Sequence, residues 1–103
     1  MARRPKGVQS AVIIDKTDAI IKAGVGILYS VNLSWSGATV GDTVVIYDHA
    51  SAASGTKLFS FYLPTTAGSF ASSFPEVGKE ALLGMFIDFT ITGGTIHVDV
   101  GFD

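Results

Sequence analysis

The chain has 103 residues, of which 48% are hydrophobic and only 16% charged, and its net charge at pH 7 is −2. This length fits one domain, because domains usually contain about 100 to 150 residues, and the absence of cysteine excludes disulfide bonds, thiol catalysis and thiolate metal sites. Soluble domains usually carry about 25% charged residues, so we expect the apolar surface of this chain to be covered in a homo-oligomer.

A basic segment precedes an acidic body. Residues 1–22 carry five basic and two acidic side chains, whereas the remainder carries two basic and seven acidic ones. Arg3, Arg4 and Lys6 are the candidate partner-binding residues, since a basic arm is attracted to phosphate, to an acidic protein surface or to the acidic body of a neighbouring subunit. The alternative is a terminus that is simply solvated.

The arm and the body divide the chain into two parts. Pro5 and Gly7 oppose regular structure, so we expect residues 1–10 to form a flexible arm and residues 11–103 to form a single β-sandwich domain.

Neither a secretory signal nor a membrane span is expected. The apolar stretch Ala11–Ile14 ends at Asp15, whereas the hydrophobic part of a signal peptide needs about 7 to 15 residues. A membrane helix needs about 20 mostly apolar residues. We therefore expect a product made in the cytoplasm, with no membrane partner.

Alternating apolar and polar residues predict β-strands through the body. Ile27–Trp35 alternates without a break, and Thr95–Phe102 repeats the pattern near the C-terminus. Each is typical of a strand with one buried and one wet face. With turn signals about every 8 to 12 residues, the sequence predicts an all-β fold of about seven or eight strands, an antiparallel β-sandwich or jelly roll. The other expected strands are 11–14, 19–22, 43–48, 57–63, 69–74 and 85–92.

Glycines mark two further features. Gly93-Gly94 separates two alternating stretches and favours a type I′ hairpin turn, so the last two strands are expected to pair. Lys79–Leu83 favours a helix by propensity, limited by Gly78 and Gly84 to about one or two turns.

The predicted core consists of the apolar side chains on one phase of these strands. Its members are Ile27, Tyr29, Val31, Leu33, Trp35, Val44, Ile46, Phe59, Phe61, Ile87, Phe89, Ile91, Ile96, Val98 and Val100.

His97 and Asp99 are the first candidates for chemistry. They fall on one face of a strand and could act as a pair of metal ligands, with Asp48 and His49 as further ligands if that loop lies nearby. Two ligands do not complete a coordination shell, so we expect solvated or interface residues and no metal site.

No enzymatic activity and no cofactor are expected. The sequence contains no G-x-S-x-G motif, which argues against a serine hydrolase. Glu76 and Glu80 could suggest the paired carboxylates of a glycosidase, but Glu76 follows Pro75 directly and both are better interpreted as solvated. The basic arm alone would bind nucleic acid only electrostatically, so no specific nucleic acid is expected.

One strand could offer a sugar-binding platform. Tyr62 and Leu58 are expected on the face opposite Phe59 and Phe61, and aromatic rings stack on sugars. Packing in the core or at an interface is the competing interpretation.

Several stretches together resemble a protein family. Ala23–Val31, Gly41–Asp48, Ala50–Leu58 and Phe89–Ile96 resemble small virion-associated β-sandwich proteins of tailed bacteriophages. The resemblance covers most of Ala23–Phe102 and consists of strand and turn signatures with no catalytic element.

The resemblance implies a jelly-roll-like virion protein that decorates or cements a phage head. It further implies a trimer, bound to the major capsid protein and made in the host cytoplasm, to which Arg3, Arg4 and Lys6 would add a tether. A receptor- or glycan-binding module of a tail or fibre is the alternative.

Overall fold

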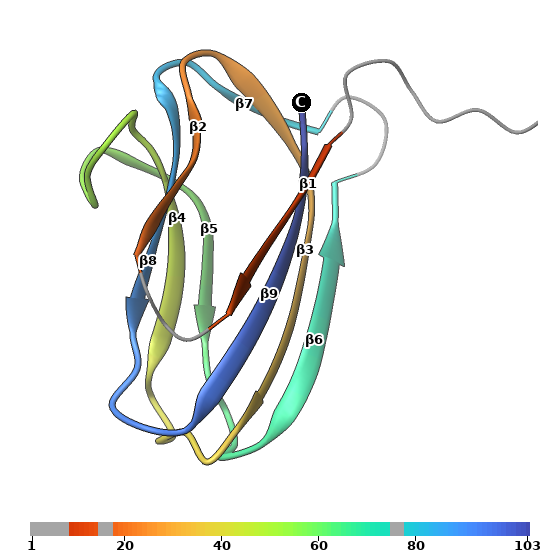
Figure 1. Cartoon of the computed structure of the whole chain (residues 1–103), viewed down its shortest axis with the longest axis vertical. Coiled ribbons are helices and arrows are strands. Elements are labelled where there is room, and N and C mark those ends of the chain that lie inside the picture. The colour runs from red at the N-terminus through yellow and green to blue at the C-terminus, as the bar shows by residue number, and fades with distance from the viewer. Residues whose placement is uncertain (1–8, 15–17, 75–77) are drawn as a thin grey trace, which may run out of the picture.

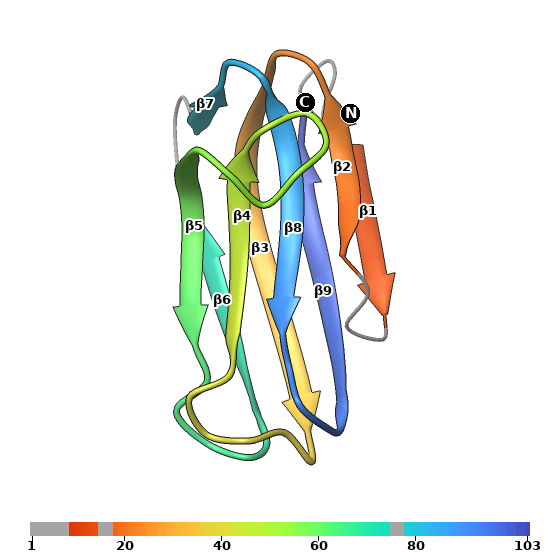
Figure 2. The ribbon, with the colours of Figure 1, turned by 90° about the vertical axis from the view of Figure 1, so that its left-hand side faces the viewer.

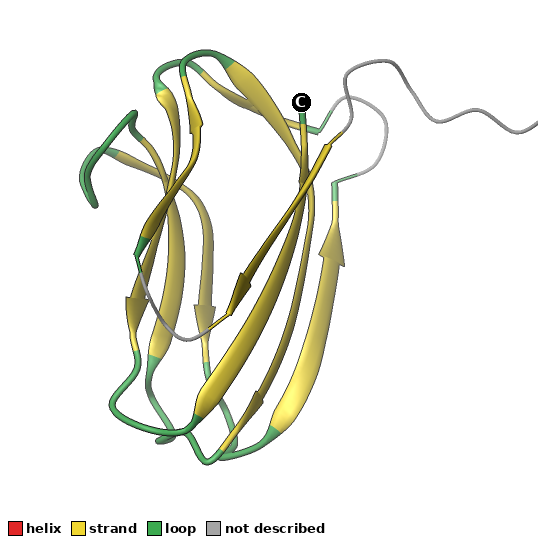
Figure 3. Cartoon of the chain, viewed as in Figure 1, coloured by secondary structure: helices red, strands yellow, loops and turns green. Residues whose placement is uncertain are grey.

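A computed structural model describes residues 9–14, 18–74 and 78–103, with the backbone alone for 9–14. These residues form nine strands and no helix (Figures 1 and 3). The strands are β1 (Gln9–Ile14), β2 (Ala19–Ala23), β3 (Gly26–Ser36), β4 (Thr43–Asp48), β5 (Thr56–Tyr62), β6 (Gly68–Ser73), β7 (Lys79–Ala81), β8 (Gly84–Thr90) and β9 (Thr95–Phe102).

The strands form two antiparallel sheets that face each other (Figure 2). The five-stranded sheet has the order β1-β9-β3-β6, with the short β7 also paired to β3, and the four-stranded sheet has the order β2-β8-β4-β5. Eight strands crossing between two sheets in this order form a jelly roll, to which β7 is an addition. The predicted fold class is confirmed.

The core lies between the sheets. Most predicted inward side chains are buried there, and Phe61, Phe89 and Ile91 pack against it while partly exposed. The confirmed buried residues are Val31, Leu33, Trp35, Val44, Ile46, Phe59, Ile87, Ile96, Val98 and Val100.

The predicted burial of Ile27 and Tyr29 is wrong, because β3 contains a bulge. Leu28 pairs with Phe102 of β9, and the next pair is Ser30 with Gly101, so Tyr29 is skipped. An extra residue reverses the side-chain phase of a strand. Leu28 is therefore fully buried, whereas Ile27 and Tyr29 are only half-buried.

A second bulge corrects the position of Leu58. The pairing of β4 with β5 shifts after Ile46 and Phe59, so Leu58 has no partner in the ladder. Leu58 turns into the core beside Phe59 instead of lying on the opposite face with Tyr62.

The last two strands do not pair. β8 belongs to the four-stranded sheet and β9 to the five-stranded sheet, so the connection through Gly93-Gly94 crosses the sandwich (Figure 2). A type I′ turn needs positive φ at both central residues, but only Gly94 has it, at 72°. Thr92 instead donates its backbone N–H to Asp42.

The expected helical turn at Lys79–Leu83 is also wrong. Lys79–Ala81 is strand β7, which pairs with the start of β3. Ala81 is buried, and Lys79 Nζ donates to the carbonyl of Leu58 at 2.8 Å. Tertiary contacts thus override a short helical propensity.

Candidate assembly surface

Three large apolar side chains are exposed together at one end of the jelly roll. Val25 lies in the β2–β3 turn, and Leu82 and Leu83 lie in the β7–β8 turn; they are 64%, 62% and 57% exposed. Both turns lie at the upper end of the molecule in Figures 1 and 2. The N–H of Gly24 donates to the carbonyl of Leu83 at 3.0 Å, which joins the turns. We call Val25, Leu82 and Leu83 the apolar tip.

The side chain of Asp48 holds the β7–β8 turn of the tip. This residue ends β4 and is only 9% exposed. Its Oδ1 accepts from the N–H groups of Leu83 at 2.8 Å and Gly84 at 3.3 Å, and its Oδ2 accepts from Leu82 at 3.1 Å. A single carboxylate therefore holds the turn that presents both leucines to solvent.

The hydrogen bonds set the protonation of Asp48. Burial acts to raise the pKa of this carboxyl, but the N–H donors of Leu83, Leu82 and Gly84 stabilise the anion and lower its pKa overall. The turn is consequently held by a charged acceptor at neutral pH, which is stronger than a neutral one.

The β4–β5 loop packs against the same turn. A Cβ on Gly84 would lie 2.7 Å from the carbonyl oxygen of Lys22 and 2.9 Å from the Cα of Ala50, so only glycine fits there. His49 Nδ1 accepts from the N–H groups of Ser51 at 3.1 Å and Ala52 at 3.0 Å. Three connections are thus locked together around the tip.

Asp42 has a similar role at the opposite end. Its Oδ2 accepts from the N–H of Thr39 at 3.2 Å and from the N–H of Thr92 at 3.1 Å, which ties the β3–β4 loop to the β8–β9 crossing. Val40 is exposed in this loop, at 59%.

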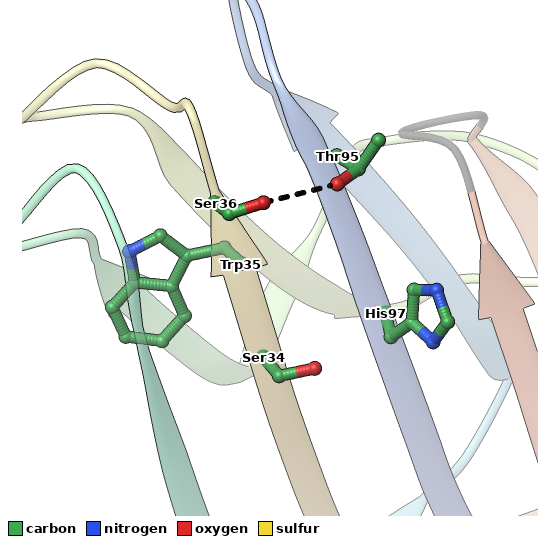
Figure 4. Close-up of a pocket in the computed structure, with 5 residues that line it drawn as sticks. All are labelled: Ser34, Trp35, Ser36, Thr95 and His97. Atoms are coloured by element: carbon green, nitrogen blue, oxygen red, sulfur yellow. Dashed lines mark hydrogen bonds between the residues drawn. The ribbon is translucent and has the colours of Figure 1, made fainter.

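His97 and Asp99 lie exposed on the outer face of β9. His97 borders a shallow hollow of about 240 Å³, lined also by Ser34, Trp35, Ser36 and Thr95 (Figure 4). Only Ser36 and Thr95 make a side-chain contact across it among the residues drawn, at 3.4 Å between their hydroxyl oxygens.

The structure does not bring the two candidate ligand pairs together. Asp48 ends β4 of the other sheet and binds backbone N–H groups, and His49 follows it and accepts hydrogen bonds within its own loop. Among the described residues, no group of three His, Asp or Glu side chains could hold a metal ion.

A pair of carboxylates lies beside the outer face of β8. Asp18 accepts the N–H of Phe89 at 2.8 Å. The pKa of Asp88 is raised, first by its partial burial and then by its hydrogen bond and charge repulsion with Asp18. The charged form of Asp88 is therefore disfavoured in the folded protein.

Most of the remaining candidate site residues lie outside the described residues. Arg3, Arg4, Lys6 and Glu76 lie outside the described residues, and Glu80 is exposed on β7.

Tyr62 is 70% exposed on the outer face of β5. The rings of Phe59 and Phe61 belong to the core side of β5 and lie beside the partly exposed Phe70 of β6; the Phe61 and Phe70 ring centroids are 4.5 Å apart. No second ring of β5 therefore shares the outer face with Tyr62.

Sequence reasoning missed the tip, although a signal was present. Val25 stands between Gly24 and Gly26, and Leu83 precedes Gly84. Large apolar residues beside turn glycines are candidates for deliberate exposure, because turns lie at the surface.

No known family model matches the sequence, and no curated protein matches it. In the part of the chain that the structure describes, no helix is long and apolar enough to cross a membrane.

Proposed function

We propose that this protein is a structural component of a virion, a decoration or cement protein that binds a capsid surface through the apolar tip. The observation that carries the proposal is the joint exposure of Val25, Leu82 and Leu83 on two turns, of which Asp48 holds the β7–β8 turn and the Gly24–Leu83 hydrogen bond joins the other to it. Exposed apolar clusters usually mark interaction sites. A preformed tip loses little conformational entropy on binding, which favours affinity.

The partner is the major capsid protein, and the decorating unit is a homotrimer. The low charged fraction of 16% supports burial of surface between copies. Several identical tips on one oligomer would bind a repeating lattice with an avidity well above that of a single tip. Arg3, Arg4 and Lys6 add electrostatic attraction to an acidic surface of the shell or of an adjoining subunit.

The test is cosedimentation of the purified protein with phage capsids that lack their own decoration protein. Val25→Ser and Val40→Ser are a matched pair, because both valines are exposed in turns but at opposite ends. The proposal predicts saturable binding that Val25→Ser weakens at least about tenfold, a loss of about 1.4 kcal/mol, whereas Val40→Ser binds as wild type. Equal binding by the two variants, or no binding by wild type, would overturn it.

A further inference from the structure

The two edges of the five-stranded sheet differ from those of the four-stranded sheet. In the four-stranded sheet, edge strand β2 contains Lys22 and a bulge, and edge strand β5 contains Lys57 and the bulge at Leu58. Charged residues and bulges are the usual protection of an edge against pairing with another chain. Strands β1 and β6 have neither, and no proline.

Both unprotected strands are in regular register. β6 pairs with β3 through six consecutive residues, and β1 pairs with β9 through six, without a shift. Within residues 9–14, 18–74 and 78–103, each has a ladder partner on one side alone. An extended strand with one unused row of N–H and C=O groups is a template for a further strand.

The outward row of β6 follows from the ladder. Phe74 donates its N–H to Tyr29 of β3 at 2.8 Å. Because backbone groups of an antiparallel strand point alternately to its two neighbours, Ser69, Ala71 and Ser73 direct theirs away from β3. These three side chains are small, so another strand could approach closely.

The outward row of β1 is found in the same way. Asn32 of β3 directs its backbone groups toward Asp99 of β9, so Asp99 directs its own away from β1. Val12, which is opposite Asp99, therefore directs its backbone groups away from the sheet, as do Ser10 and Ile14. The registers place Val12 at the level of Asp99, Asn32 and Ala71 across the sheet. The outward groups of one edge therefore stand level with those of the other.

We propose that β6 of one copy pairs with β1 of the next copy, Ala71 opposite Val12, so that the five-stranded sheets join head to tail into a closed ring. The strand directions allow this pairing. Each of β1, β9, β3 and β6 is antiparallel to the next, so β6 runs opposite to β1 of its own chain. It therefore also runs opposite to β1 of a neighbouring copy that is related by rotation. Such a ring covers both unprotected edges, whereas a symmetric β6–β6 dimer leaves β1 uncovered.

Charge supports a second copy as the occupant. In this pairing the start of β1 of one copy lies level with the end of β6 of the other copy. Beyond the end of β6, the short strand β7 pairs with the same side of β3 and carries the exposed Glu80. Arg3, Arg4 and Lys6 precede β1 in the sequence, and their positive charge is opposite in sign to that of Glu80.

The inference specifies the homo-oligomer of the proposed function, and its test uses no capsid, so its failure leaves particle binding to be judged separately. Ala71→Pro removes an outward N–H of β6, and Val12→Pro removes one of β1. Ser60→Pro is the matched control, because it removes an outward N–H from an edge strand of the other sheet. Leu63 donates its N–H to Asp42, on the side of β4, so by alternation the N–H of Ser60 points away from β4.

Light scattering on the purified chains should give wild type and Ser60→Pro the mass of an oligomer of two or more 10.7 kDa chains. Ala71→Pro alone and Val12→Pro alone should each have the mass of a monomer. Mixing Ala71→Pro with Val12→Pro should restore one interface and give a 1:1 heterodimer, even if β1 of Val12→Pro no longer folds onto β9. A wild-type monomer, an oligomer formed by Val12→Pro alone, or a mixture that stays monomeric would overturn the head-to-tail pairing.

Discussion

Asp48 Oδ1 accepts the backbone N–H of Leu83 at 2.8 Å, so a buried carboxylate of β4 supports a leucine that is 57% exposed. The same carboxylate holds Leu82 and Gly84. Apolar exposure at this end is therefore a built feature of the fold, because losing it would require breaking charge-assisted hydrogen bonds.

Asp48→Asn should destabilise the protein. The amide keeps the shape but replaces one acceptor oxygen by a donor that faces backbone N–H groups, which costs about 1 to 3 kcal/mol of unfolding free energy. The pKa of Asp48 is lowered in the folded state, so its stabilisation is present above the unfolded value of 3.8 and is lost as the pH falls through the folded pKa. Urea unfolding at neutral and acidic pH measures both effects.

Asp99→Asn, on the exposed face of β9, is the control for Asp48→Asn and should change the unfolding free energy by less than about 0.5 kcal/mol. Equal losses in the two variants would contradict the role of Asp48.

Asp88→Asn should stabilise the protein at neutral pH. The folded pKa of Asp88 lies above its unfolded value, so the folded state gains stability as the pH falls through that pKa and is disfavoured by the charge above it. Removing the charge relieves repulsion with Asp18. The urea midpoint of the variant should exceed that of wild type at about pH 7, and the difference should shrink toward about pH 3, where carboxylates protonate. A variant less stable than wild type at neutral pH would show that Asp88 makes a favourable interaction instead.

Gly94→Ala and Gly93→Ala should differ sharply. A Cβ on Gly94 would collide with the backbone of Ser36 and Gly37 and would sit at a φ of 72°, whereas a Cβ on Gly93 would meet only the carbonyl of Gly37, at 3.7 Å. We expect a loss of about 2 to 4 kcal/mol for Gly94→Ala and under about 1 kcal/mol for Gly93→Ala, measured by chemical denaturation. Similar large losses at both positions would point to a type I′ hairpin instead of a crossing between sheets.

Leu28→Ala and Ile27→Ala test the bulge in β3. Leu28 is fully buried and Ile27 is half-buried, so the first change should cost about 2 to 5 kcal/mol and the second clearly less. Thermal or urea unfolding of the two variants gives the comparison. A larger loss of unfolding free energy for Ile27→Ala would contradict the bulge and favour the unbroken alternation that the sequence predicts.

Periodicity was sufficient to predict the antiparallel β-sandwich and most of its core. Val31, Leu33 and Trp35 lie inward because they share one phase of a strand that is regular from Ser30 onward. The phase fails at Tyr29 and Leu58, where one strand carries an extra residue that its partner lacks. A bulge depends on the register between two strands, which one strand's own sequence does not specify.

The assembly surface was less predictable than the core. Composition indicated that apolar surface would be exposed, but it did not indicate where. The tip depends on Asp48 reaching Leu82 and Leu83, which are 34 and 35 residues away in the sequence. Such a contact is set by the order of strands in the sheets, so the sequence alone offered Asp48 only as a conditional further ligand beside His49 and did not indicate its contact with the turn.

Electron cryo-microscopy of capsids incubated with the protein tests the central claim most directly. We predict additional density on the shell that fits the jelly roll with the β2–β3 and β7–β8 turns, and hence Val25, Leu82 and Leu83, against the capsid. Density in which the β3–β4 and β8–β9 connections contact the shell, or a capsid surface without additional density at saturating protein, would contradict the assignment of the apolar tip as the docking surface.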